Sequence, residues 1–235
     1  MTVQKISKIF IFIMIIVGIN GCVAVEELKE ETHSVELGEV ESAEIMLRMS
    51  QGELKVRSGA RDLMEGTFEY NVRRWKPDID YSEFAGKGRL VVRQGRKSGI
   101  PIGKSRNTWN IALSGSLPIA LVVDFGAGEG DLDLRGLDLE SLDIDMGVGD
   151  LTVDLSSQPE QDLEVTIDGG IGSAKVYLPE NIGVRVDVDK GIGSVHAQGM
   201  IKRGNTYTNE AFGKTETTID ITIDAGIGSI DLRLK

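Results

Sequence analysis

The sequence predicts an all-β, solenoid-like stack of strand–Gly-x-Gly–strand repeats, each about 21 residues long, and three observations support this. From about residue 44 onward apolar and polar residues alternate, which is the period of a strand with one buried face. Helical periodicity is nearly absent, and the 29 glycines favour frequent turns. The third observation is internal repetition, which is typical of stacked coils. The alternative is a β-sandwich in which each repeat is a strand pair.

The first segment, residues 1–22, has the features of a lipoprotein signal peptide. Lys5 and Lys8 precede an apolar run over residues 9–19, about half of the ~20 residues that a spanning helix needs. The sequence Ile-Asn-Gly-Cys then resembles a lipobox, although Asn20 stands where a small residue is usual. Cys22 is the single cysteine, which fits lipidation better than a disulfide. The alternative is an uncleaved signal anchor.

The rest of the chain divides into a tether and a repeat domain. Residues 23–44 are acidic, and we expect a flexible tether there because it follows the lipidated cysteine directly. Residues 45–235 form the β-repeat domain, with an N-terminal part over 45–120 and Gly-x-Gly repeats over 121–235. An insertion is expected within 199–214, because the last motif follows the previous one after 35 residues.

Each repeat changes the parity of its apolar residues at the Gly-x-Gly motif. In 142–155, Leu142, Ile144, Met146 and Val148 share one face, whereas Leu151, Val153 and Leu155 follow in the opposite phase. A straight strand cannot bury both sets on one side, so the motif predicts a corner that glycine permits. The middle residue of each later motif is expected to point inward, as Ile171 would. The predicted turn glycines are Gly128, Gly130, Gly147, Gly149, Gly170, Gly172, Gly191, Gly193, Gly226 and Gly228.

The glycine motifs do not have the context of a nucleotide site. A dinucleotide fingerprint needs a helix after its glycines, and a P-loop needs Gly-Lys-Ser/Thr, whereas these motifs continue into another strand. A weaker hypothesis concerns calcium, because one aspartate precedes each of four motifs by two residues and stacking would align them as a ladder. The more ordinary interpretation is that each one caps its own turn. These aspartates are Asp145, Asp168, Asp189 and Asp224.

Composition argues against catalysis and against nucleic-acid binding. The two histidines, His33 and His196, lie far apart in the sequence, and no nucleophile–base pattern includes either. We therefore expect no enzyme activity, no cofactor and no further metal site. The formal net charge of −11 disfavours nucleic acid as a partner. The basic segment 71–106 could contact an anionic envelope polymer, or it could offset the acidic remainder as a solvated face.

Two segments resemble a known family. Residues 108–155, with a strand ending in Pro118, a Gly-x-Gly-Asp-Leu step and its repetition, are similar to the toast-rack domain and to the C-terminal domain of LiaF-like proteins. Residues 75–95 resemble the N-terminal part of the same domain, and adhesin-like β-repeat proteins are related. The resemblance covers roughly 45–235 and implies a right-handed β-helix type of fold at the cell envelope. It implies no catalytic residues.

The resemblance also implies two kinds of function. Some family members regulate envelope-stress signalling by contacting a membrane histidine kinase, but this chain has a lipobox where those have several membrane helices. We therefore expect an exported, non-enzymatic binding or scaffold module of adhesin-like character. It would be lipid-anchored at the outer face of a prokaryotic cell membrane, or at the outer membrane, and would bind an envelope protein or polymer. The alternatives are a stress regulator acting through protein contact and a calcium-stabilised surface protein.

The lipobox leads to a direct test. In Cys22→Ser the thioether to diacylglycerol cannot form, so we expect the protein to lose its acyl anchor and to keep its signal peptide. Metabolic labelling with a radioactive fatty acid and the mass of the isolated protein measure both effects. Label incorporated equally into the wild type and Cys22→Ser would contradict lipidation at this residue.

Overall fold

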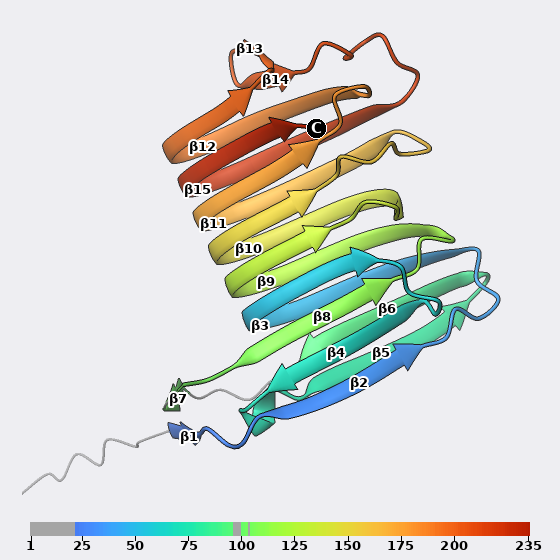
Figure 1. The fold of residues 1–235 in the computed structure, drawn as a ribbon, viewed down its shortest axis with the longest axis vertical. Coiled ribbons are helices and arrows are strands. Elements are labelled where there is room, and N and C mark those ends of the chain that lie inside the picture. Colours follow the sequence, from blue (N-terminus) through green and yellow to red (C-terminus); the bar gives the residue numbers. More distant parts are fainter. Residues whose placement is uncertain (1–21, 96–99, 103) are drawn as a thin grey trace, which may run out of the picture.

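The computed structural model describes residues 22–95, 100–102 and 104–235, and most of these residues lie in strands. Figure 1 shows a tall stack in which long strands run side by side and each turns back on itself at one edge of the stack. The connections between coils gather at the opposite edge (Figure 1). The predicted signal peptide, apart from Cys22, lies outside the described residues.

Six strands of 16 or 17 residues form the body of the stack: β3 (Ser42–Ser58), β9 (Pro118–Asp133), β10 (Asp138–Asp154), β11 (Leu163–Leu178), β12 (Gly183–Gln198) and β15 (Thr218–Leu234). Shorter strands cover its ends: β2 (Lys29–Val35), β4 (Met64–Tyr70), β5 (Pro77–Phe84), β6 (Lys87–Gln94) and β8 (Asn107–Leu113) at one, β13 (Ile201–Arg203) and β14 (Thr206–Thr208) at the other. The remaining elements are the paired strands β1 (Cys22–Ala24) and β7 (Ile100–Ile102), and a 3₁₀ turn, η1 (Arg73–Trp75).

The long strands pair in parallel along both of their halves. Their first halves form one layer, in the order β5-β6-β3-β9-β10-β11-β15-β12-β14-β13. Their second halves form the other, in the order β2-β4-β8-β3-β9-β10-β11-β15-β12. Parallel neighbours need a return path for the chain, and here the second half of each strand supplies it. The predicted solenoid-like stack of strand–Gly-x-Gly–strand repeats is thus confirmed.

The corner of each long strand contains a glycine that no other residue can replace without strain. In β11 this is Gly172, with φ of +149°. A Cβ there would lie 1.7 Å from the carbonyl oxygen of Gly149 in the neighbouring coil. Successive coils therefore approach each other through bare backbone at the corner. The parity change that the sequence predicted occurs at this bend.

The core lies between the two layers and is almost wholly aliphatic. In β10, Leu142, Ile144 and Met146 from the first half face Leu151 and Val153 from the second, and all five are buried. Each such side chain stabilises the fold by roughly 1.5–3 kcal/mol through removal of its surface from water. Because the same pattern recurs in every coil, the core is one continuous column.

Side-chain amides complete the first coil, where the chain is broken. β6 and β8 together stand where one long strand would pair with β3, and neither reaches its corner. There the Gln94 Oε1 accepts hydrogen bonds from the backbone N–H of Ser50 and Gln51, at 2.9 and 3.2 Å. The Asn107 Nδ2 donates to the carbonyl oxygen of Gln51 at 2.8 Å. These groups satisfy backbone atoms that would otherwise be buried without partners.

The structure corrects the predicted tether. Residues 29–35 form β2, which pairs antiparallel with β4 and closes the second layer. Glu31 accepts a hydrogen bond from the Tyr70 hydroxyl at 2.7 Å, and the His33 ring packs edge-on against Phe68. The prediction of a tether is wrong because the high charge of this segment hides a short alternation that is typical of a strand. In KEETHSV the partly buried residues are Glu31, His33 and Val35, and they alternate with exposed residues as in a strand.

Two further differences concern the repeats. In the first motif of 121–235, the register pairs Gly149 with Gly128 and Val148 with Ala127, so the corner is Gly126-Ala127-Gly128, and Gly130 lies beyond it. The sequence 126-GAGEG-130 contains two overlapping Gly-x-Gly motifs, and only the register with β10 distinguishes them. Strand order also departs from chain order, because β15 lies between β11 and β12. The predicted insertion contains β13 and β14, which extend the first layer beyond β12.

Replacing a corner glycine should be far more damaging than replacing a glycine in a loop. Gly172→Ala adds both an unfavourable φ and a clash with backbone, so we expect a loss of at least ~3 kcal/mol in the free energy of unfolding. Gly204→Ala is the matched control, because Gly204 has φ of +64° but open space around it, and should cost ~1 kcal/mol. Urea unfolding followed by circular dichroism measures both. Equal losses would show that close coil contact is not the constraint.

Candidate functional site

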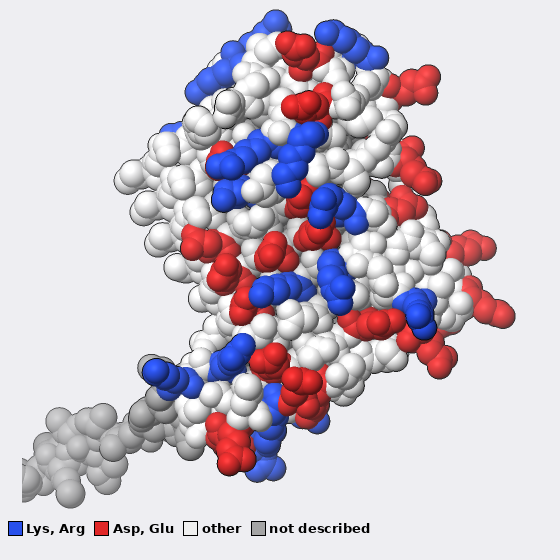
Figure 2. All heavy atoms as spheres, viewed as in Figure 1, with Lys and Arg blue, Asp and Glu red and all other residues white. Residues whose placement is uncertain are grey.

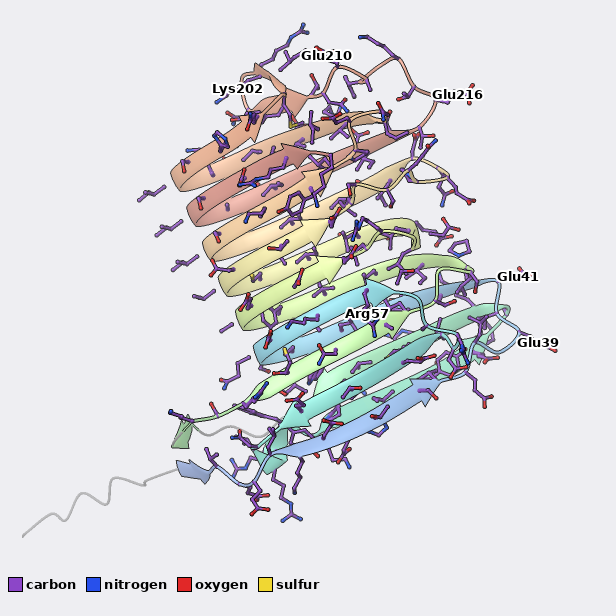
Figure 3. The ribbon with its side chains drawn as sticks, in the orientation of Figure 1. Glu39, Glu41, Arg57, Lys202, Glu210 and Glu216 are labelled. Atoms are coloured by element: carbon purple, nitrogen blue, oxygen red, sulfur yellow. The ribbon has the colours of Figure 1, made fainter. Side chains whose placement is uncertain are left out.

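The middle residues of the corners project into solvent as a row. The structure aligns Val148, Ile171, Ile227 and Ile192 from four successive coils in register, in this order. Their exposed fractions are 51%, 51%, 49% and 73%. We call these four residues the corner ridge. Figure 3 shows uncharged side chains projecting from the row of corners at the left edge of the stack.

The prediction that Ile171 points inward is therefore wrong. Both flanking glycines lie against the neighbouring coil, where a Cβ at Gly170 would be 2.2 Å from the carbonyl oxygen of Gly147. The inner side of the corner is filled by backbone, so the middle side chain can point only outward. The alternation of the strand gave the opposite expectation because it stops at the bend.

An acidic groove runs beside the ridge on the outer face of the first layer. Its volume is about 560 Å³, and the glycines and backbone of the corners form much of its lining. Four carboxylates align along it, one from each coil, with neighbouring strands about 4.8 Å apart. In spatial order these are Asp145, Asp168, Asp224 and Asp189.

Four carboxylates and one ammonium line the groove. Among the described residues, no salt bridge includes any of the four carboxylates. Lys190 also lines the groove, but its ammonium donates to the carbonyl oxygen of Gly193 at 2.8 Å. Burial first, and then the charges of Asp224, Asp145 and Asp143, raise the pKa of Asp168. Four carboxylates are thus stacked beside one cationic side chain, Lys190, which forms no salt bridge with them in the described part of the chain.

The calcium and turn-cap interpretations of these aspartates gain no support. Within the described part of the chain, no group of three or more His, Cys, Asp or Glu side chains is arranged to hold a metal ion. A ladder places its carboxylates in a line, whereas calcium needs oxygens that converge from several directions. The hydrogen bonds of the described residues also include none from these carboxylates to the corner backbone.

The other predicted residues do not form a second site. His33 is on β2 and His196 is on β12, at opposite ends of the second layer. The His33 Nε2 lies 3.2 Å from the Glu31 Oε2, and His196 is exposed. Cys22 begins β1, which pairs with β7, and lipidation at this residue remains a prediction. No helix in the described ranges has the length and apolar character to cross a membrane.

Several cations of the basic segment 71–106 form ion pairs within the protein. Arg93 lies 3.5 and 3.7 Å from the carboxylates of Asp78 and Asp80. Lys76 pairs with Glu31 at 3.0 Å. Figure 2 shows cationic and anionic side chains intermixed over the visible face, while the row of projections at its upper left edge is uncharged. This agrees with the interpretation that the segment offsets acidic neighbours.

A second concavity, of about 680 Å³, lies at the C-terminal end beside β13 and β14. Arg185, Arg203 and Phe212 contribute to its lining. Arg185 is already engaged, at 2.9 Å from Asp220 and 3.4 Å from Asp187. Lys202, Glu210 and Glu216 lie around this end of the stack in Figure 3. Sequence reasoning missed this pocket because a loop between strands creates it.

Comparisons with known proteins agree with the fold. The family model for the N-terminal domain of toast-rack matches residues 24–177, and that for the C-terminal domain of LiaF, the cell-wall-active antibiotics response protein, matches residues 128–232. A crystal structure described as a candidate cell adhesion protein, from Clostridium sporogenes, is 34% identical, with TM-score 0.84 over 89% of this chain and 100% of that chain. A candidate adhesin from Bacteroides fragilis is 12% identical, with TM-score 0.34 over 89% and 99%. No curated protein matches the chain.

The stacked carboxylates predict a pH-dependent stability difference. Because the pKa of Asp168 is raised in the folded protein, the folded state holds this proton more tightly than the unfolded chain does. Stability contributed at this position therefore falls as pH rises through the raised pKa. Asp168→Asn removes the charge, so we expect a higher Tm at neutral pH and no gain below pH ~3, where the carboxyl is mostly protonated in both states. Calorimetry across this pH range measures the difference, and a gain independent of pH would contradict it.

Proposed function

This chain belongs to the toast-rack family, and from that membership we propose that it is a non-enzymatic binding module of the cell envelope. It is held at the membrane by a lipid on Cys22 and binds another envelope component through the corner ridge. The relative from Clostridium sporogenes, described as a candidate cell adhesion protein, supports a surface role.

The observation that carries the proposal is the exposure of the corner ridge. The inward positions of the coils are filled by buried aliphatic side chains, so the fold has no need of further apolar residues at its corners. Single exposed apolar residues are common on protein surfaces, but four β-branched residues aligned on adjacent strands form a continuous apolar feature. Such features mark surfaces that contact a partner.

The N-terminal geometry supports a fixed placement at the membrane. Six residues lie between Cys22 and Lys29, the first residue of β2, so the chain between these two positions spans at most ~25 Å. β2 closes the N-terminal end of the stack, whereas β12 and β13 lie at the other end (Figure 1). A lipid on Cys22 would thus hold the N-terminal end near the membrane and direct the ridge-bearing coils away from it.

A second function, regulation of an envelope-stress response through protein contact, is favoured by one observation. The match to the C-terminal domain of LiaF, over residues 128–232, contains all four residues of the corner ridge. The same surface would then contact a signalling protein, and the two functions differ in the identity of the partner.

Site-specific photocrosslinking in cells tests the proposed function. A benzophenone amino acid at Ile171 should give adducts with an envelope component, because this side chain lies on the ridge. The same substitution at Phe84, which is 86% exposed on β5 outside the ridge, is the control. Adducts with a signalling kinase would favour the regulatory role. An absence of adducts at Ile171, or identical adducts at both positions, would contradict binding through the ridge.

A further inference from the structure

We propose, resting on the binding function above, that the corner ridge and the acidic groove together take a basic amphipathic helix from a partner protein. The aliphatic side chains of the helix pack on the ridge, and its lysine and arginine side chains enter the groove. Each surface thereby selects one of the two chemical features of the partner.

The two surfaces are close enough for one segment to contact both. In every coil the carboxylate precedes the ridge residue by three positions, as Asp168 precedes Ile171. The intervening glycines carry no side chains, and the register keeps this offset the same in all four coils. A partner lying along the stack thus meets an apolar row and an anionic row in parallel.

The repeat distances favour a helix along the stack. Neighbouring strands are about 4.8 Å apart, so the four ridge residues span about 14 Å. One turn of an α-helix rises 5.4 Å, which nearly matches one coil. Residues on one face of an extended strand are about 6.7 Å apart, so their spacing departs from the ~4.8 Å spacing of the coils within three coils. A helix can therefore place one aliphatic and one basic side chain on each coil.

The carboxylates of the groove favour a partner with positively charged side chains. The groove carries one cation, Lys190, and four carboxylates that form no salt bridge among the described residues. Burial first, and then the neighbouring carboxylates, raise the pKa of Asp168. A cationic side chain relieves the repulsion between these carboxylates, which should speed association and add specificity. An anionic lipid surface would meet the same repulsion. A second copy packed ridge to ridge would bring two acidic grooves together, which costs free energy.

Defined peptides test the proposal with the full-length lipidated protein in nanodiscs of zwitterionic lipid. The probe is a labelled helical peptide with leucines on one stripe and lysines on the adjacent one, and binding is measured by fluorescence anisotropy against empty nanodiscs. We expect the lysine peptide to bind, and the same peptide with glutamate for lysine, or serine for leucine, to bind at least roughly tenfold more weakly.

Two pairs of variants assign binding to the two surfaces. Asp168→Asn with Asp224→Asn should weaken binding by roughly five- to tenfold, because two partly exposed charge pairs are lost. Its control is Asp131→Asn with Glu160→Gln, which changes the net charge equally outside the groove and should leave binding unchanged. Ile171→Thr with Ile227→Thr keeps β-branching and should weaken binding by roughly tenfold.

The control for the isoleucine pair is Phe84→Thr with Ile201→Thr, which removes exposed apolar residues elsewhere. Thermal unfolding of each variant checks that the fold is intact. Equal binding of the lysine and glutamate peptides would overturn the proposal. It would also be overturned if the isoleucine variants weakened binding only to zwitterionic vesicles, or only to a second copy of the chain, and left peptide binding unchanged. If crosslinks at Ile171 persist in cells while peptide selectivity fails, the proposed function stands and this inference falls. If both fail, the binding function falls too.

Discussion

The fold depends on close backbone contact at the corners. There the second glycine of each motif has φ between +137° and +155°, and a Cβ would lie 1.7–1.9 Å from a carbonyl oxygen in the next coil. Only glycine meets both conditions, so the long strands all bend at equivalent positions along their length. The bend brings the two halves of a strand face to face, and this creates the core. It also fixes the register, because a shift of one residue would place a side chain against backbone.

The same contact determines the surface. Since glycines occupy both sides of the corner, the residue between them is directed outward and aligned with its counterparts. The carboxylates that precede the motifs are aligned for the same reason. Stacking alone does not require a large aliphatic residue at the middle position, because β3 has Gln51 and β9 has Ala127 there. The aliphatic residues of the C-terminal coils are therefore not a requirement of the corner, which is why they point to binding.

Local patterns predicted the repeats, the corners and the buried faces, because each depends on alternation and on glycine within about 15 residues. The order of the coils depends on non-local pairing, and nothing in the motifs of β12 and β15 distinguishes which lies beside β11. The strand pattern could not predict the direction of Ile171, because the contact with the neighbouring coil determines it. A Cβ added at Gly170 or Gly172 would lie 2.2 or 1.7 Å from backbone of that coil, so the inner side of the corner has no room for a side chain. These distances join atoms of two different coils, so the sequence of one strand does not reveal them. β2 was missed because its pairing partner, β4, lies 29 residues or more away.

The position of β15 links the last strand of the chain to the candidate site. It lies between β11 and β12 and pairs in parallel with both. Ile227 is therefore the third of the four residues in the ridge, and Asp224 is the third of the four carboxylates in the groove. Ile171 and Ile192 lie about 9.6 Å apart, twice the strand spacing, and without β15 no ridge residue would lie between them. Neither the ridge nor the groove would then be continuous. The C-terminal strand thus completes the core and the surface in one step, and a chain that has not packed its last coil cannot present the full ridge and groove to a partner.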